Sequence, residues 1–310
     1  MSMKTIVLII LIAIVGCFHS CNELELREST YRYFKGTNAE DLAYAVNEGD
    51  TIEIERILSE SPELLDSRDS VYEMTLLMHT IWNQTRVKYP LRFIVDAPYS
   101  SSWESNREQL KSFRFLLNKG ANVNYQTKKG WTPLILASMK KYGNIEIVKL
   151  LIERGAEVNA EAEDPGYSHD RGRFTPLMFA VHINREDIAE LLLNNGANID
   201  YVNKVGNTAL GAAIHTNSYY EYHMAMFLLI HGADYTKPYS ISGYNQITLV
   251  RDLRERMYEL DSDEHKQKME IVDYLREKGI DYKKVPIPEK VVKYAKRKYP
   301  DSWQEYLDNY

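Results

Sequence analysis

The hydrophobic positions of this chain follow the spacing of short amphipathic helices. In residues 145–152 apolar side chains recur every three or four positions, and residues 188–192 repeat the arrangement. This spacing places the apolar side chains on one face of an α-helix. Another short apolar stretch precedes each of these segments. The pattern therefore predicts pairs of short helices, each with one face to bury.

Capping residues mark where these helices begin and end. Thr132 and Thr175 each stand directly before a proline, and a threonine N-cap followed by proline at the first helical position is a typical helix start. Gly155 and Gly196 follow the second stretch of each pair, where glycine supplies the left-handed conformation that ends a helix. The expected unit is a helix, a turn, a second helix and a loop.

This unit recurs along the chain. Four segments align on a threonine, and each is followed by two apolar-periodic stretches and a Gly-Ala pair. The four starts are Thr75-Leu76-Leu77-Met78, Thr132-Pro133-Leu134-Ile135, Thr175-Pro176-Leu177-Met178 and Thr208-Ala209-Leu210-Gly211, and the glycines are Gly120, Gly155, Gly196 and Gly232. Ordering a residue costs about 1–2 kcal/mol of backbone entropy, which a lone short helix pair cannot offset by burial at about 25 cal/mol per Å². The units are therefore expected to stack on one another.

The repeated sequence resembles the ankyrin repeat family, whose repeat of about 33 residues joins Thr-Pro-Leu to Gly-Ala-Asp. The resemblance covers roughly residues 38–282 and is most specific in residues 128–206. Residues 40–66 keep the helical pattern without the threonine, as an N-terminal capping unit would, and a sixth unit in residues 247–281 is stretched between its helices. The histidine that usually follows Thr-Pro-Leu in the family is absent from the four aligned units.

The resemblance implies an all-α fold, an ankyrin-repeat solenoid of about six helix-turn-helix units with insertions and a C-terminal helical cap. The largest insertion is residues 84–107, the next is residues 161–173, and a shorter one lies around Tyr219, Tyr220 and Tyr222. After the last repeat a terminal helix is expected, followed by a second short helix beyond Pro300. The predicted segments are a signal peptide in 1–16, a linker in 17–37, the ankyrin repeat domain in 38–284 and the helical cap in 285–310.

The N-terminal residues indicate export. An apolar run of about a dozen residues follows Lys4, which fits a signal-peptide core and is short of the roughly 20 residues that span a bilayer. A short membrane anchor and a buried strand are the alternatives. The chain's two cysteines follow this run, and Ile14 to Cys17 resembles the lipobox of bacterial lipoproteins. We expect Cys17 to carry the lipid, and Cys21 is the alternative site. The remaining possibility is that both are incidental cysteines of the signal peptide. The expected location is the bacterial cell envelope, lipid-anchored in the periplasm or at the cell surface.

Composition and charge give no support for nucleic acid as a partner. The 310 residues are 44% apolar and carry a formal net charge of −6. The chain therefore has no overall positive charge that would favour binding to nucleic acid. Charge is polarised along the chain, because residues 39–70 carry −8 and residues 283–298 carry +6. Such runs are usually solvated faces of the end units, although the basic run could attract a membrane or an anionic partner.

No residue set predicts catalysis or a cofactor. The sequence has no glycine-rich phosphate loop and no zinc-hydrolase histidine pair, and neither cysteine lies in the repeats. Asp164, His169 and Asp170 could ligate a metal, but we interpret them as a solvated loop, and His79 as a histidine at the edge of the core. We expect no enzyme activity, no metal, no cofactor and no small-molecule substrate. An active site within residues 84–107 is the weakest alternative.

The resemblance also implies a binding surface, since the ankyrin family binds partners through turn tips and the outer face of each first helix. Carried onto this chain, the positions hold five basic residues and no acidic ones, beside large aromatic residues that typically dominate interfaces. The set is Tyr72, Trp82, Lys128, Lys129, Trp131, Met139, Lys140, Arg171, Phe174, His182, Lys204, Asn207 and His215.

We therefore expect a protein–protein interaction module that binds a protein partner on its concave face, an acidic one in the sharper form of the hypothesis. The alternative function is an immunity or inhibitor protein that neutralises a toxic enzyme. The alternative interpretation of the surface is structural. Trp131 and Phe174 then only cover the stacked helices, and the lysines are ordinary solvent-exposed residues of the turns.

Overall fold

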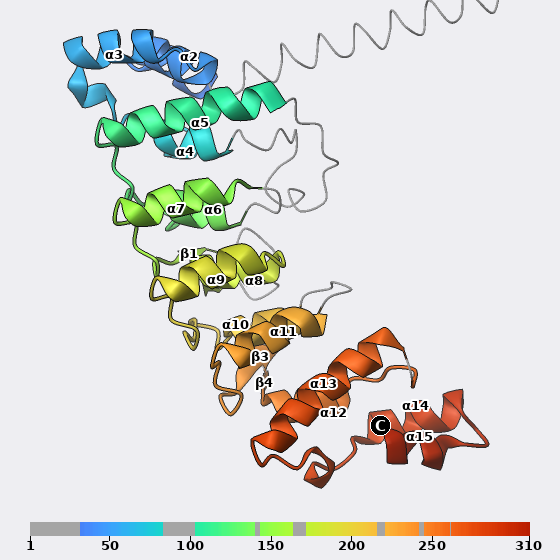
Figure 1. Ribbon diagram of the computed structural model, residues 1–310. Coiled ribbons are helices and arrows are strands. Elements are labelled where there is room, and N and C mark those ends of the chain that lie inside the picture. The colour runs from blue at the N-terminus through green and yellow to red at the C-terminus, as the bar shows by residue number, and fades with distance from the viewer. Residues whose placement is uncertain are drawn as a thin grey trace, which may run out of the picture. The chain divides into compact units, whose positions relative to one another are not determined.

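The computed structural model describes residues 32–82, 103–139, 143–163, 172–215, 221–241, 245–260 and 262–310. Helices dominate these ranges, with two short antiparallel two-stranded sheets beside them (Figure 1), and the expected all-α fold is confirmed. The chain divides into two compact units, residues 1–160 and 161–310. The division falls inside the predicted repeat domain of residues 38–284, and the two units are described separately.

The described part of unit 1 contains three consecutive helix pairs. The first helices of the pairs pack on their neighbours, α2 on α4 and α4 on α6, and α5 also packs on α2 and α3. Figure 1 shows these pairs as successive layers. The elements are α2 (Glu40–Glu48), α3 (Thr51–Glu60), the short 3₁₀ helix η1 (Pro62–Leu64), α4 (Leu76–Trp82), α5 (Trp103–Asn118), α6 (Pro133–Ser138) and α7 (Ile145–Glu153).

Unit 2 contains the remaining helix pairs. Helix α8 packs on α9 and on α10, α10 packs on α11, and α13 packs on α11. The repeat elements are β1 (Ala162–Glu163), β2 (Arg173–Phe174), α8 (Pro176–His182), α9 (Glu186–Asn194), α10 (Ala209–His215), α11 (Glu221–Ile230), β3 (Tyr239–Ile241), β4 (Asn245–Ile247), α12 (Leu249–Glu255) and α13 (Asp263–Glu277). They are followed by the 3₁₀ helix η3 (Tyr282–Lys284), α14 (Glu289–Lys298) and α15 (Trp303–Asn309).

The predicted helix caps are present. The hydroxyl of Thr132 accepts from the Ile135 amide at 3.2 Å, and that of Thr175 accepts from the Met178 amide at 3.3 Å. Each bond satisfies an amide of the first helical turn that has no partner within the helix. Gly155 has φ +82°, which confirms the expected left-handed helix end. The local prediction of where these helices begin and end is therefore confirmed.

Two of the predicted insertions are shorter than expected. Helix α5 begins at Trp103, so the end of the insertion predicted for residues 84–107 is helical. Tyr222 lies within α11 and is 2% exposed, so it belongs to the core and not to the third insertion. In both places the observed helix begins earlier in the chain than the repeat pattern indicates. The ends of helices are the least reliable part of an assignment from sequence.

The two small sheets were not predicted. Ala162 pairs with Phe174, so β1 and β2 join the ends of the insertion predicted for residues 161–173. Strands β3 and β4 follow the fifth helix pair, and Tyr239 lies opposite Ile247. Both residues of this second pair are buried, and the side chains of directly opposed residues in an antiparallel pair lie on the same face of the sheet. The hairpin therefore adds its own side chains to the core of unit 2.

The C-terminal residues fold as expected into a helix and a second short helix, α14 and α15. They pack chiefly on each other and form a small core. Its buried members are Val291, Ala295, Tyr306 and Tyr310. The domain limits proposed from the sequence, including residues 285–310 as a separate cap, stay predictions.

Candidate protein-interaction surface

The first exposed turn of unit 1 is built around a buried carboxylate. Asp69, 2% exposed, accepts from the backbone amides of Val71 at 2.8 Å, Tyr72 at 2.6 Å and Met74 at 2.9 Å. Its Oδ2 also bonds His79 Nε2 at 2.9 Å. Although burial alone would raise it, these hydrogen bonds hold the pKa of Asp69 below its usual value. The turn is therefore rigid, and it holds Val71 and Tyr72 in solvent, 60% and 47% exposed.

His79 is fully buried and is not at the edge of the core as the sequence suggested. Its ring packs against Tyr33 at 5.6 Å and Phe34 at 5.3 Å between centroids. Its Nδ1 has no hydrogen-bond partner among the described residues, so the Nε2–H tautomer that donates to Asp69 satisfies the pair best. The histidine supports the turn and is not exposed to a ligand.

The second exposed turn belongs to the next repeat. The Thr127 amide donates to the Trp131 carbonyl at 3.0 Å, and the Trp131 amide donates to the Thr127 hydroxyl at 3.1 Å. Gly130, with φ +86°, closes the turn, a conformation that favours glycine. The turn directs Lys128 and Lys129 into solvent, and the Lys128 side chain is 86% exposed.

Two contacts join these neighbouring turns. Lys128 forms an ion pair with Glu73, which lowers the pKa of Glu73 and raises that of Lys128. Arg68 donates to the Tyr125 hydroxyl at 3.5 Å, and its guanidinium lies 5.7 Å from the centre of that ring. These contacts are exposed and add little stability, but they orient the side chains. We name the resulting patch the tip surface, formed by Arg68, Val71, Tyr72, Tyr125, Lys128 and Lys129.

The predicted binding residues of unit 1 divide between surface and interior. Tyr72, Lys128 and Lys129 lie on the tip surface, while Trp82, the last residue of α4, is half-buried. Trp131 is 7% exposed and Met139 is 1% exposed, so neither side chain reaches a partner in this conformation. Lys140 lies outside the described residues.

The predicted residues of unit 2 divide in the same way. Lys204 is exposed and His182, at the end of α8, is half-buried. Phe174 is 1% exposed, with its ring 5.4 Å from Phe179, and Asn207 is buried in the turn that contains Lys204. Arg171 and the side chain of His215 lie outside the part of the chain that the structure describes. Whether the exposed members bind a partner stays a prediction.

Sequence reasoning missed three members of the tip surface, Arg68, Val71 and Tyr125. They stand outside the family positions that were carried over, and Arg68 and Tyr125 meet only because two repeats stack. One available signal was Asp69 followed by exposed-type residues, since an aspartate that accepts from the following amides is a common turn former.

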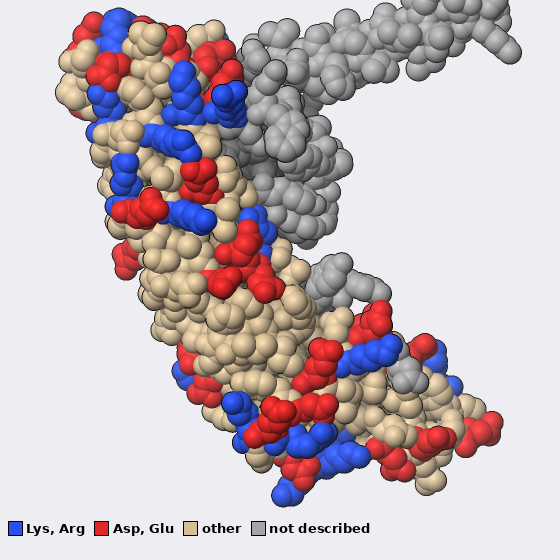
Figure 2. Space-filling model, viewed as in Figure 1, with Lys and Arg blue, Asp and Glu red and all other residues tan. Residues whose placement is uncertain are grey.

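The basic C-terminal run is offset by neighbouring acids. Lys290 pairs with Glu255 at 2.7 Å, and Lys298 pairs with Glu259 at 2.7 Å. On the face shown in Figure 2, basic and acidic side chains also alternate over α13, where Arg276 pairs with Asp273 at 2.7 Å. The local charge is therefore lower than the +6 of residues 283–298 suggests.

The described residues contain neither a metal site nor a membrane span. No group of three or more His, Cys, Asp or Glu side chains is placed to hold a metal within them, and Asp164, His169 and Asp170 lie outside them. Among the helices that are described, none is both long and apolar enough to cross a bilayer. The site with the clearest geometry is therefore the tip surface.

Stacked helix pairs with projecting turns define a helical repeat protein. A family model described as ankyrin repeats in three copies matches residues 103–162 and 160–238. Residues 103–238 of this chain therefore contain ankyrin repeats, and ankyrin repeats indicate a protein–protein interaction module.

Relatives are similar to parts of this chain. An ankyrin repeat protein of fowlpox virus is 34% identical over 95 residues, which is 31% of this chain and 15% of that protein. Mouse protein phosphatase 1 regulatory subunit 12A is 36% identical over 112 residues, 36% of this chain and 10% of the relative. Human ankyrin repeat and KH domain-containing protein 1 is 38% identical over 93 residues, 30% of this chain and 3% of the relative. The chain therefore spans a small part of the length of each.

Proposed function

We propose that this protein binds an acidic segment of a protein partner through the tip surface of unit 1. The observation that supports the proposal is the composition of that surface. Three exposed cations, Arg68, Lys128 and Lys129, lie on the two turns that also present Tyr72, while Glu73 pairs with Lys128 and the acid Asp69 is buried within the first turn. In a chain of net charge −6, this local excess of positive charge favours an acidic partner by steering and by complementarity.

The two turns are preorganised for binding. Asp69 holds the first turn with three amide hydrogen bonds, and the Thr127–Trp131 pair holds the second. A surface that is already ordered loses less conformational entropy when a partner binds. Tyr72 then supplies apolar area at low entropic cost, and aromatic side chains of this kind are frequent hot spots.

Charge reversal tests the proposal. The variant Lys128→Glu with Lys129→Glu is compared with the wild type after crosslinking in its native envelope and mass spectrometry of the captured partners. We expect the specific partner to be recovered at least tenfold less, about 1.4 kcal/mol. The matched control is Lys149→Glu, an exposed lysine on α7 of the same unit. Unchanged recovery with the double variant contradicts the proposal.

We further propose that the protein is exported and carries lipid on Cys17, with Cys21 as the alternative. The support is the apolar run before Cys17 and the lipobox-like residues Ile14 to Cys17. A single acyl chain binds membranes weakly and reversibly, and two or more chains make the anchoring stable. Intact-mass analysis of the membrane-extracted protein is expected to show a mature N-terminus at Cys17 with a lipid adduct, lost in Cys17→Ser. Retention of residues 1–16 contradicts the proposal.

The inhibitor hypothesis is a narrower form of the same function. It expects the captured partner to be an enzyme whose activity falls when the protein is added in stoichiometric amount. The charge-reversal variant should then fail to inhibit.

A further inference from the structure

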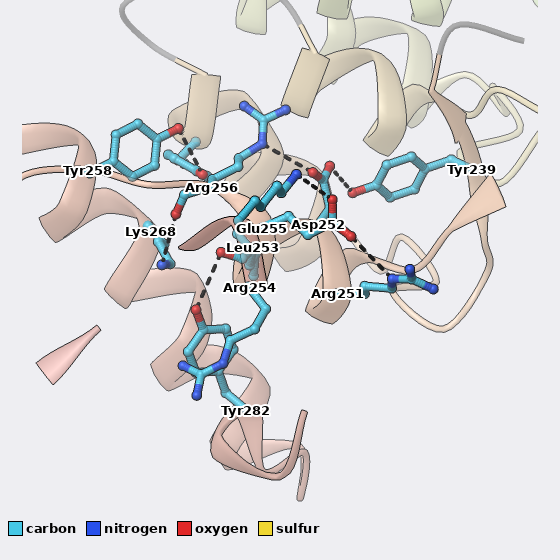
Figure 3. A network of polar contacts seen from close by, with 12 residues as sticks. Tyr239, Arg251, Asp252, Leu253, Arg254, Glu255, Arg256, Tyr258, Lys268 and Tyr282 are labelled. Carbon is cyan, nitrogen blue, oxygen red and sulfur yellow. Dashed lines mark hydrogen bonds and ion pairs between the residues drawn. The ribbon is translucent and has the colours of Figure 1, made fainter. Parts of the chain in front are cut away.

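A buried lysine lies near the C-terminal end of unit 2. Lys268 of α13 is 0% exposed, although lysine is almost never fully buried without a partner. Its Nζ donates to the Arg256 carbonyl at 3.4 Å, the long end of hydrogen-bond range. Figure 3 shows the amine directed at that carbonyl, below the network around Asp252.

Aromatic rings close the rest of the site. The Lys268 Nζ lies 3.4 Å from the centre of the Tyr310 ring and 5.5 Å from that of Tyr282. Arg254 of α12 shares the same two rings, at 5.8 Å and 4.6 Å. Tyr310 follows α15 directly and Tyr282 belongs to η3, so residues from three segments meet at the amine. Ring faces attract a cation, but they do not replace the acceptors that an ammonium group finds in water.

The charged neighbours of Lys268 oppose its protonation. The charge that acts on Lys268 is that of Arg254, whose own donors are used by the carbonyl of Val285 at 3.2 Å and the main-chain oxygen of Tyr310 at 2.7 Å. The nearby carboxylate of Asp252 is held by Arg256 at 3.3 Å and by the Tyr239 hydroxyl at 2.8 Å. Among the described residues Lys268 has no ion pair with a carboxylate. Burial, with a smaller contribution from Arg254, lowers the pKa of Lys268 to about 7.

The helix pair that closes over Lys268 is a candidate unit of local opening. Helices α14 and α15 pack chiefly on each other, around a small core that Met257, Leu260 and Ile287 also contact. The pair is tied to the preceding segments by hydrogen bonds from Tyr306 to the Tyr258 carbonyl at 2.8 Å and from Lys283 to the Asp308 carbonyl at 3.1 Å, and by the ion pairs of α14 with Glu255 and Glu259. Elements of this kind at the end of a fold open at a lower free energy than the core.

We propose that Lys268 is a proton-controlled latch for the C-terminal helix pair. The neutral amine lets Tyr310 and α15 close over α13. Protonation creates a charge that needs water or an anion, and it is satisfied when α15 moves away. The open form binds the proton more tightly than the closed form, so by linkage the closed form gains stability as pH rises from the closed-state pKa toward that of a solvated lysine.

Hydrogen exchange of the full-length protein tests the latch. Peptides covering residues 303–309 are compared at about pH 6 and about pH 8.5, after correction for intrinsic exchange rates. We expect their protection to be lower at the acidic pH by on the order of tenfold or more, since opening takes up a growing fraction of a proton as pH rises through the closed-state pKa and nearly one proton at about pH 8.5. Equal protection at the two pH values overturns the proposal.

The latch proposal predicts opposite behaviour for two variants of Lys268. Lys268→Met keeps the volume without the charge and should hold the pair closed at both pH values. Lys268→Arg is charged at both and should leave it open at both. The matched control is Lys266→Met, an exposed residue of the same helix, which should behave as the wild type. A wild-type pH dependence in Lys268→Met overturns the proposal.

A direct titration covers the case in which a variant fails to fold. In the wild-type protein, lysine side-chain NMR should show one amine that titrates near neutral pH while the others titrate near about 10.4, the usual lysine value. If every lysine amine titrates near the usual value, Lys268 is solvated and the latch does not exist.

Discussion

Single buried polar residues decide the shape of the exposed turns. Asp69 is the clearest case, because one carboxylate satisfies three backbone amides and a buried histidine. Thr132 and Thr175 do the same on a smaller scale for the helix starts. The threonines were predictable because capping is a local property of the chain. The full role of Asp69 was not, since its partner His79 lies ten residues away and is buried by Tyr33 and Phe34.

Removing the Asp69 carboxylate should destabilise unit 1. We expect Asp69→Ala to lower the free energy of unfolding by about 2–3 kcal/mol, because it leaves buried amides and His79 without an acceptor. Urea unfolding monitored by circular dichroism measures the loss. Glu63→Ala is the control, because Glu63 is exposed and its removal should change stability by less than about 0.5 kcal/mol. Equal effects of the two variants contradict the proposed role of Asp69.

The Asp69 carboxylate should also make the stability of unit 1 depend on pH in the acid range. The pKa of Asp69 is lowered in the folded protein, so its contribution is present above the unfolded value of about 3.9 and is lost as pH falls through the folded pKa. Unit 1 of the wild type should therefore lose stability more steeply below about pH 4 than Asp69→Asn does. Parallel acid titrations of unfolding free energy measure the difference, and identical slopes contradict it.

At the scale of elements, the fifth repeat has a strand packed against the helix position where the ankyrin family usually has a histidine side chain. Gly211 of α10 occupies the position where the ankyrin family usually has histidine. A Cβ there would lie 2.6 Å from Asn207 Oδ1 and 2.8 Å from the Cβ of Tyr239. Tyr239 comes from β3, which packs on α10. The sequence showed that the histidine was absent, but the reason became visible only when the unpredicted hairpin was placed.

The close approach of Asn207 and Tyr239 to Gly211 predicts how a methyl group at this position would change the free energy of unfolding. Helix propensity alone would favour Gly211→Ala by about 1 kcal/mol, but the overlap with Asn207 and Tyr239 should reverse the sign. We expect a net loss of about 1–3 kcal/mol, measured by urea unfolding. A stabilised variant would mean that α10 and β3 separate at little cost, and it would contradict the packing described here.

At the scale of the whole molecule, the two compact units hold different kinds of feature. Unit 1 carries the tip surface, whose side chains are exposed and preorganised. Unit 2 carries a buried polar network in which Asp252, Arg256 and Tyr239 satisfy one another. Burial raises the pKa values of Tyr222, Tyr239 and Tyr310 in this unit. Its stability should therefore depend on pH at the alkaline end as well as through Lys268.

The tyrosines predict alkaline unfolding of unit 2. Their pKa values are higher in the folded state, so their contribution is full below the unfolded value of about 10 and is lost as pH rises above it. Each such group adds a slope of up to about 1.4 kcal/mol per pH unit. We expect buried tyrosines to ionise together with the loss of helical circular dichroism, and Tyr222→Phe to shift that transition to higher pH. Tyrosinate absorbance that rises well before the helices are lost contradicts this.

The sequence by itself determined the repeat architecture and several helix ends. Hydrophobic spacing, threonine caps and terminal glycines act within a few residues, so they can be identified along the chain without knowing what packs where. The tertiary structure decided which candidate binding residues reach solvent and which distant side chains meet. Trp131, Met139, Phe174 and Asn207 are buried because neighbouring segments cover them, and Lys268 meets Tyr310 across 42 positions of the chain. Burial depends on stacking between segments, and no local pattern encodes it.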